Sequence, residues 1–157
     1  MSGANAVRDL SIRPFRPGDQ PAARGLILQG LSEHFAAVDA SLNPDLDDIQ
    51  GEYIVRGHLF LVAERGPKLV GTGALRVEQE YVGRIVRVSV APEFRRRRVG
   101  RALVMRLVEA ATVLGLKRVW VETNDDWADA IALYRACGFE PYLHAGGSVY
   151  LERRLTA

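Results

Sequence analysis

The sequence lacks several features that would place it in a protein class at once. Its single cysteine, Cys137, excludes an intrachain disulfide and fits a reducing compartment. No apolar run approaches the ~20 residues needed to span a bilayer, and residues 1–9 lack the apolar core of a secretion signal. We therefore expect a cytoplasmic protein without a membrane partner, in which residues 1–9 form a flexible N-terminus.

An excess of charge and the common catalytic motifs are also absent. The chain has no G-x-x-x-x-G-K-S/T, H-E-x-x-H or G-x-S-x-G pattern, which argues against a phosphate-binding loop, a zinc protease and a serine hydrolase. His34, His58 and His144 do not have the spacing of metal ligands, so we expect no metal. The net charge is only +2, and the positive charge is concentrated between Arg84 and Arg101.

The most informative stretch that is present joins a strand to a basic turn and a helix. Residues 85–90 are rich in β-branched residues, residues 95–98 are all arginine, and residues 99–114 have helical periodicity. At a helix start the first N–H groups have no intrahelical partner and the dipole is positive. Because Gly100 also allows close backbone approach, this turn predicts phosphate binding. A solvated basic turn and a nucleic-acid contact are the alternatives.

Strand and helix patterns alternate along the rest of the chain. Strands are predicted at 10–15, 59–64, 69–77, 85–90, 117–123, 139–143 and 148–155, and helices at 21–35, 43–55, 99–114 and 128–137. The strand after the long 99–114 helix should run parallel to the strand before it. If these two strands splay apart, they leave a cleft at their carboxyl ends. We expect one α/β (α+β) domain over residues 10–157.

Two motifs, in this order along the chain, resemble those of the GCN5-related N-acetyltransferase (GNAT) family. Arg95 and Gly100 occupy the first and last positions of the acyl-CoA signature Arg/Gln-x-x-Gly-x-Gly/Ala, with Arg98 in place of its middle glycine. Residues 130–139 match the pattern A-x-x-L-Y-x-x-x-G-F. The resemblance covers most of the chain from residue 11 to residue 155. It implies the GNAT fold, with a mixed central sheet of about six to seven strands flanked by about four helices.

The resemblance further implies an acyltransferase that moves an acetyl group from acetyl-CoA to a primary amine by direct attack in a ternary complex. Main-chain groups of Val88, Ser89 and Val90 would pair with the pantetheine arm and polarise the acetyl carbonyl. The phosphates of coenzyme A would be bound at the basic turn, by Arg95, Arg96, Arg97, Arg98, Val99, Gly100 and Arg101. We expect Arg98 to adopt ordinary helical geometry with its N–H exposed.

Tyr134 matches the family tyrosine that protonates the departing thiolate, and it could also contact the cofactor. Free thiol and phenol pKa values of ~8.5 and ~10 make this proton transfer chemically reasonable. Packing of an amphipathic helix residue is the alternative. Cys137 is expected to be a small buried hydrophobe. Many relatives have an asparagine that contacts the cofactor near the start of this helix. Trp127 stands at that position here, and the nearby Asn124 is the residue to which the resemblance assigns the contact.

The general base and the acceptor are less clearly indicated. Many relatives have a glutamate on the strand that contains Val88, but here that position is Arg84. Glu78 or Glu80, on the preceding hairpin, could instead accept the amine proton directly or through water, and solvated hairpin residues are the alternative. If Arg84 or Arg87 faces the cleft, it could bind a carboxylate, which favours an amino-acid-like acceptor.

Three readings of function remain open on the sequence. The first is the N-acetyltransferase acting on a small-molecule or protein amine, in which the final hairpin could pair two subunits. The second is a noncatalytic acyl-CoA sensor with the same fold, favoured by the missing glycine and the undefined base. The third is a nucleic-acid-binding module built on the arginine run, which the modest net charge of +2 argues against.

Overall fold

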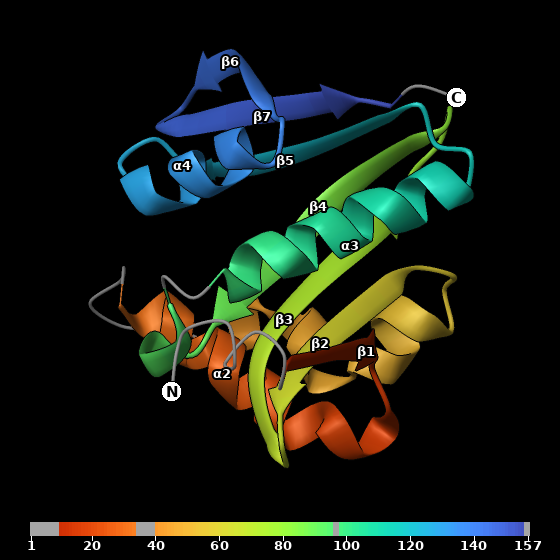
Figure 1. Cartoon of the computed structure of the whole chain (residues 1–157), viewed down its shortest axis with the longest axis vertical. Helices are drawn as coiled ribbons and strands as arrows, with labels where there is room; N and C mark the ends of the chain where they lie inside the picture. The colour runs from red at the N-terminus through yellow and green to blue at the C-terminus, as the bar shows by residue number, and fades with distance from the viewer. Residues whose placement is uncertain (1–9, 34–39, 96–97, 156–157) are drawn as a thin grey trace.

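A computed structural model describes residues 10–33, 40–95 and 98–155 of the chain. Their centre is a seven-stranded sheet in the order β1-β2-β3-β4-β5-β7-β6 (Figure 1). The strands are β1 (Leu10–Pro14), β2 (Leu59–Arg65), β3 (Lys68–Val77), β4 (Val82–Val90), β5 (Arg118–Asn124), β6 (Glu140–Ala145) and β7 (Ser148–Arg154). The α-helices of the described residues are α2 (Gln20–Ser32), α3 (Val99–Val113) and α4 (Ala128–Ala136).

The sheet is mixed, as predicted. The pair β4–β5 is parallel, and every other neighbouring pair is antiparallel. The parallel pair is joined only where residues 82–84 meet residues 118–120. In Figure 1 the two strands meet at one end, near the C-terminus, and diverge toward the other. The predicted splay is therefore confirmed.

Each face of the sheet is covered by its own hydrophobic core. Alternation along β2 sends Leu61 and Ala63 toward α3 and α4, whereas Phe60 and Val62 pack toward α2. The glycines of β3 allow α3 to lie close to the sheet: a Cβ on Gly71 would come within 2.9 Å of a Leu103 methyl group.

The helix predicted over 43–55 is replaced by two shorter segments. A 3-10 turn covers Pro44–Asp47 and a π-helical turn covers Gln50–Ile54, in which the Val55 N–H donates to the Gln50 carbonyl at 2.9 Å. Gln20 explains the break, because its side chain donates to the Leu46 carbonyl and accepts from the Ile49 N–H. These contacts from α2 satisfy backbone groups that a continuous helix would have used.

Two remaining features of the fold are the end of α2 and the length and polarity of the described helices. Helix α2 ends at Ser32, and the last predicted residues of that helix, 34 and 35, lie outside the described residues. Within residues 10–33, 40–95 and 98–155, no helix combines the length and apolar character that crossing a membrane requires.

Candidate active site

A cavity of about 930 Å³ opens where β4 and β5 separate. Its walls come from β4 and the end of β3, from α2, from the segment that contains Asp45 and Tyr53, and from β5 with α4. This volume lies in the range of small-molecule sites. The predicted cleft at the carboxyl ends of the parallel strands is therefore present.

A bulge in β4 shapes one wall of the cavity. The register between β3 and β4 shifts between Thr72 and Ala74, and Arg87 adopts a positive φ of 57°. The hydroxyl of the fully buried Thr72 holds this geometry by donating to the Arg87 carbonyl at 2.8 Å. Val88, Ser89 and Val90 then line the cavity along an edge of β4 that does not pair with β5.

The helix α3 begins beside this edge with unused backbone donors. Its first intrahelical bond runs from the Ala102 N–H to the Arg98 carbonyl at 2.9 Å, so the N–H groups of Val99, Gly100 and Arg101 have no intrahelical partner. Such a helix start attracts phosphate groups. Of the remaining predicted phosphate ligands, Arg96 and Arg97 lie outside the described residues.

The expectation of helical geometry at Arg98 is wrong. The residue has φ 63° and ψ 16°, which is the left-handed conformation. This conformation costs a residue with a Cβ about 1–2 kcal/mol, and it explains why the related signature has glycine here. At Gly100 a Cβ would lie 3.3 Å from a Leu133 methyl group, so the small size of this residue also lets α3 pack against α4. The close approach of a ligand at Gly100 stays a prediction.

Arg95 lines the cavity with its guanidinium already engaged. It donates to both carboxylate oxygens of Glu33, at 2.5 and 2.9 Å, and through Nε to the Val90 carbonyl at 3.1 Å. The side chain therefore links the end of α2 to the end of β4. A phosphate bound by Arg95 would have to compete with Glu33.

Tyr134 lies on α4 and lines the cavity, with a relative exposure of 7%. Its ring meets Phe139 edge-on at a centroid distance of 5.9 Å. Burial, and to a smaller extent the neighbouring Cys137, raises the pKa of the Tyr134 hydroxyl above its usual value. The hydroxyl consequently carries its proton at neutral pH. Cys137 is itself buried, as expected.

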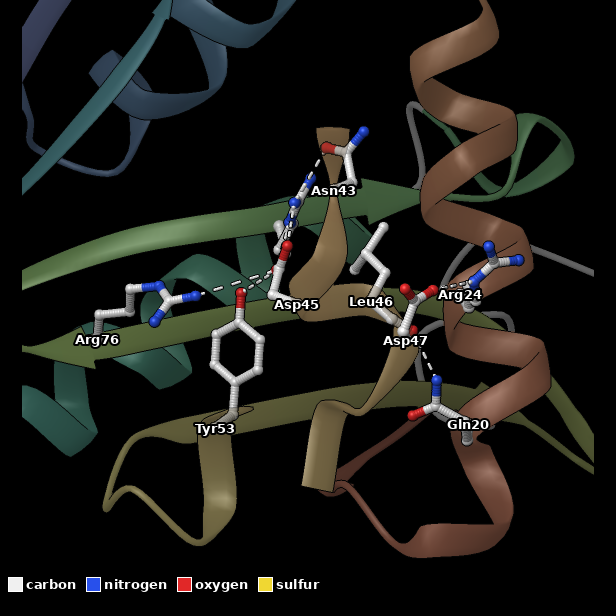
Figure 2. Close-up of polar contacts among 9 residues, drawn as sticks. Gln20, Arg24, Asn43, Asp45, Leu46, Asp47, Tyr53 and Arg76 are labelled. Atoms are coloured by element: carbon white, nitrogen blue, oxygen red, sulfur yellow. Dashed lines mark hydrogen bonds and ion pairs between the residues drawn. The ribbon is translucent and has the colours of Figure 1, made fainter. Parts of the chain in front are cut away.

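A network of polar side chains fixes the opposite wall (Figure 2). Arg87 donates to Asp45 through Nε at 3.0 Å and Nη2 at 2.6 Å, and to the Asn43 side chain at 3.1 Å. The Tyr53 hydroxyl donates to Asp45 at 2.7 Å. Arg87 is therefore bonded to protein groups, contrary to the expectation that it would be available to bind an acceptor carboxylate.

The hydrogen bonds and the burial of this network shift the pKa values of Asp45 and Tyr53. Burial alone would raise the pKa of Asp45, but the hydrogen bonds from Arg87 and Tyr53 lower it below its usual value. Burial and the hydrogen bond to Asp45 raise the pKa of Tyr53 to about 12. At neutral pH, Asp45 is therefore ionised and Tyr53 is neutral.

Arg84 lines the cavity, whereas Glu78 and Glu80 do not. The Arg84 guanidinium lies over the Trp120 ring at 4.5 Å and pairs with Glu122 at 3.2 Å. Glu78 accepts a hydrogen bond from the Trp120 indole at 2.7 Å, and Glu80 is exposed in the β3–β4 turn. Neither predicted base is thus in the cavity wall.

Asn124 is another residue that the structure places outside the wall. It ends β5 opposite Ser148, and its carbonyl accepts the Trp127 N–H at 3.1 Å. Trp127 does line the cavity. Asn124 therefore acts as a turn residue at the start of α4.

Sequence reasoning missed Asp45, Tyr53 and Arg76, which all line the cavity. Asp45 and Tyr53 come from the segment predicted as the helix 43–55, and no local pattern marks them as part of a site. Arg76 could have been found, because the hairpin between β3 and β4 places it opposite Arg84.

Comparisons with known proteins agree with this architecture. The model of the family described as "Acetyltransferase (GNAT) family" matches residues 27–139. The chain belongs to this family. It is 29% identical over 135 residues to "Uncharacterized N-acetyltransferase YjgM" of Escherichia coli (strain K12), a match that covers 82% of this chain and 81% of that protein. Family membership makes the protein an acyltransferase.

Solved structures show the same fold. A GNAT-family acetyltransferase from Staphylococcus aureus Mu50 superposes with a TM-score of 0.85 at 18% identity, covering 94% of this chain and 99% of that one. The PaiA N-acetyltransferase from Thermoplasma acidophilum, solved in complex with coenzyme A, gives a TM-score of 0.82 at 16% identity, covering 93% and 99%. The predicted GNAT fold is confirmed.

The strain at Arg98 can be tested by substitution. Arg98→Gly should raise the free energy of unfolding by about 0.5–1 kcal/mol, because glycine relieves the left-handed strain but adds freedom to the unfolded chain. Urea denaturation measures the change. As a control, Arg106→Gly on the exposed face of α3 should lower stability by about 1 kcal/mol. Equal destabilisation by both variants would contradict strain at Arg98.

The Asp45–Arg87 contact should make stability depend on acid pH. The folded-state pKa of Asp45 is lowered, so its contribution is present above the unfolded pKa of about 4 and is lost as pH falls through the folded value. Asp45→Asn should therefore flatten the fall in unfolding free energy below about pH 4. Glu109→Gln, on the exposed face of α3, is the control. An unchanged slope in Asp45→Asn would exclude the contact as its source.

Proposed function

We propose that the protein is an acetyl-CoA-dependent N-acetyltransferase that acts on a small primary amine by direct attack in a ternary complex. The observation that carries this proposal is the arrangement around one cavity. A buried, protonated Tyr134 and the edge of β4 that does not pair with β5 line it. The start of α3, whose first N–H groups have no intrahelical partner, is not part of the cavity wall, but Gly100 lies next to Val90 on that edge. Family membership agrees with this combination.

The residues present fit acetyl-CoA as cosubstrate. The N–H groups of Val99, Gly100 and Arg101 suit the pyrophosphate, because they have no intrahelical partner and lie at the positive end of the α3 dipole. The edge of β4 at Val88–Val90 that does not pair with β5 suits an extended pantetheine arm, which can pair with main-chain groups as a neighbouring strand would. On this edge the Val90 carbonyl already accepts from Arg95, so it is not available to the arm. A main-chain N–H aimed at the acetyl oxygen would stabilise its developing negative charge by ~3 kcal/mol.

In the proposed reaction, the amine nitrogen forms a bond to the acetyl carbon and the carbon–sulfur bond breaks. Tyr134 donates its hydroxyl proton to the departing sulfur, which is the role of a general acid. Because the pKa of Tyr134 is raised above its usual value, complete transfer to a thiolate of pKa ~8.5 is uphill. The hydrogen bond from Tyr134 therefore stabilises the departing sulfur mainly in the transition state, while negative charge builds on it.

The amine proton is proposed to leave through water in the open cavity. Five carboxylates line the wall, and three of them are already held by arginines: Glu33 by Arg95, Asp45 by Arg87 and Glu122 by Arg84. The other two, Asp126 and Asp129, lie at the start of α4, where a water path could deliver the proton. Glu78 and Glu80 do not line the wall. The base role considered for these two glutamates is accordingly replaced by a water path, and their substitution by glutamine is expected to leave turnover nearly unchanged.

Calorimetric titration with acetyl-CoA tests the cofactor site first, with desulfo-CoA and adenosine bisphosphate as comparisons. We expect saturable one-to-one binding, followed by thiol release when a panel of primary amines is added. Absence of binding at millimolar ligand would overturn the cofactor assignment. Binding without thiol release for any amine would instead support the noncatalytic sensor.

Tyr134→Phe tests the general acid. We expect kcat to fall by about 100-fold or more, because the hydroxyl proton is removed while the ring and its packing on Phe139 remain. The Kd for acetyl-CoA should stay close to that of the wild type. Tyr150→Phe is the matched control, since Tyr150 stacks on Trp120 and does not line the cavity. An equal fall in both variants would exclude a specific role for Tyr134.

A further inference from the structure

Two arginines face each other in the wall of the cavity. Arg76 on β3 pairs in register with Arg84 on β4, and both line the cavity. Residues directly opposite on neighbouring strands have Cβ atoms about 4.5–5.5 Å apart on one face, and like charges there are destabilising. Negative charge between or beside the two guanidinium groups would therefore reduce their mutual repulsion.

Each guanidinium is held on an aromatic ring. The Arg76 Cζ lies 4.5 Å from the centroid of the Tyr53 ring, and the Arg84 Cζ lies 4.5 Å from the centroid of the Trp120 ring. Stacking on a ring fixes the plane of a guanidinium and leaves the N–H groups on its edge for partners in that plane. Both groups are thus oriented before a ligand arrives.

The protein carboxylates nearby do not use all of these donors. Asp45 accepts from Arg87 and from the Tyr53 hydroxyl, whereas Arg76 approaches it only at 4.0 Å. Arg84 donates to Glu122 through Nη2. The buried Nε of Arg84 has no hydrogen-bond partner among residues 10–33, 40–95 and 98–155. A buried donor left without a partner is unfavourable, and a ligand oxygen would satisfy it.

We propose that Arg76 and Arg84 bind a carboxylate of the acceptor, so that the acceptor is a small molecule with a carboxylate and a primary amine. Two oriented guanidinium groups match the planar, paired oxygens of a carboxylate. The inference rests on the proposed function. It keeps the carboxylate-bearing acceptor expected from the sequence and assigns Arg76 as the partner of Arg84, instead of Arg87, which donates to Asp45 and Asn43.

The position of the pair along β4 also constrains the shape of the acceptor. Four residues separate Arg84 from Val88, which corresponds to about 13 Å of extended strand, and the bulge at Arg87 shortens this length. The arginine side chains span part of the distance. The carboxylate and the reacting amine therefore belong at opposite ends of the acceptor.

Matched acceptor pairs test the proposal in a thiol-release assay with acetyl-CoA. Each pair consists of an amine that carries a carboxylate and its carboxamide on the same carbon skeleton. We expect wild-type kcat/KM to be about 10-fold or more higher for at least one acid than for its amide. Arg76→Gln and Arg84→Gln should raise the KM for that acid by about 10- to 100-fold, leave kcat nearly unchanged and bring the acid-to-amide ratio close to one.

Two further variants show whether a rise in KM comes from the charge and shape of the Arg84 side chain or from a loss of protein stability. Arg84→Lys keeps the charge but loses the planar fork, so its KM should lie between those of the wild type and Arg84→Gln. Arg106→Gln, on the exposed face of α3, should leave all constants unchanged. Acetyl-CoA affinity, measured by calorimetry for each variant, shows whether the fold and the cofactor site persist.

The possible outcomes distinguish this inference from the proposed function. Wild-type turnover of acids and amides with equal kcat/KM would overturn the carboxylate site and leave the acetyltransferase standing. A markedly lower KM for an aminophosphonate than for the matched amino acid would overturn the carboxylate as the preferred anion. If acetyl-CoA does not bind, or if no amine releases thiol, both the inference and the proposed function fail.

Discussion

The separation of β4 from β5 after a short parallel pairing is the constraint on which the site depends. Only residues 82–84 and 118–120 pair, so the rest of β4 keeps an open edge. The bulge at Arg87, held by Thr72, then lets Val88–Val90 line the cavity. The start of α3 and the hydroxyl of Tyr134 gain their proposed roles because they lie beside this opening.

The arginines of the cavity wall differ in how many of their N–H groups are used by protein carboxylates. Arg87 and Arg95 are satisfied by Asp45 and Glu33 and act as links between segments distant in the sequence. Arg76 and Arg84 are oriented by aromatic rings. Each also contacts one carboxylate through Nη2, Arg84 that of Glu122 at 3.2 Å and Arg76 that of Asp45 at 4.0 Å, which leaves further N–H groups for a ligand. A cavity organised in this way needs little rearrangement to receive an anion, which lowers the entropic cost of binding.

The sequence was sufficient for features set by local pattern. The β-branched residues 85–90 and the helical period after Val99 predicted the strand and the helix correctly. The motif around Tyr134 directed attention to a residue that lines the cavity. The turn over Pro44–Ile54 was not predictable, because its cause is a contact from Gln20 on another helix. The positive φ of Arg98 was also missed, since sequence preference opposes it and the surrounding fold imposes it.

The pairing of charges across the cavity could be predicted from the sequence only in part, because it depends on contacts between distant parts of the chain. Arg84 was selected correctly as a residue that faces the cleft. Its partner Arg76 follows from strand register rather than from any motif. The engagement of Arg87 by Asp45 joins residues 42 positions apart in the chain, and no spacing rule for a single sequence predicts such a contact.

The short β4–β5 junction has a mechanical consequence. Antiparallel pairing makes each half of the sheet stiff, with β1–β4 on one side and β5, β7 and β6 on the other. The three paired positions between the halves form the most compliant line across the sheet. Small rotations about this line change the width of the cavity while leaving the hydrogen bonds within both halves intact. We expect such rotations to let the cavity accept ligands of different thickness.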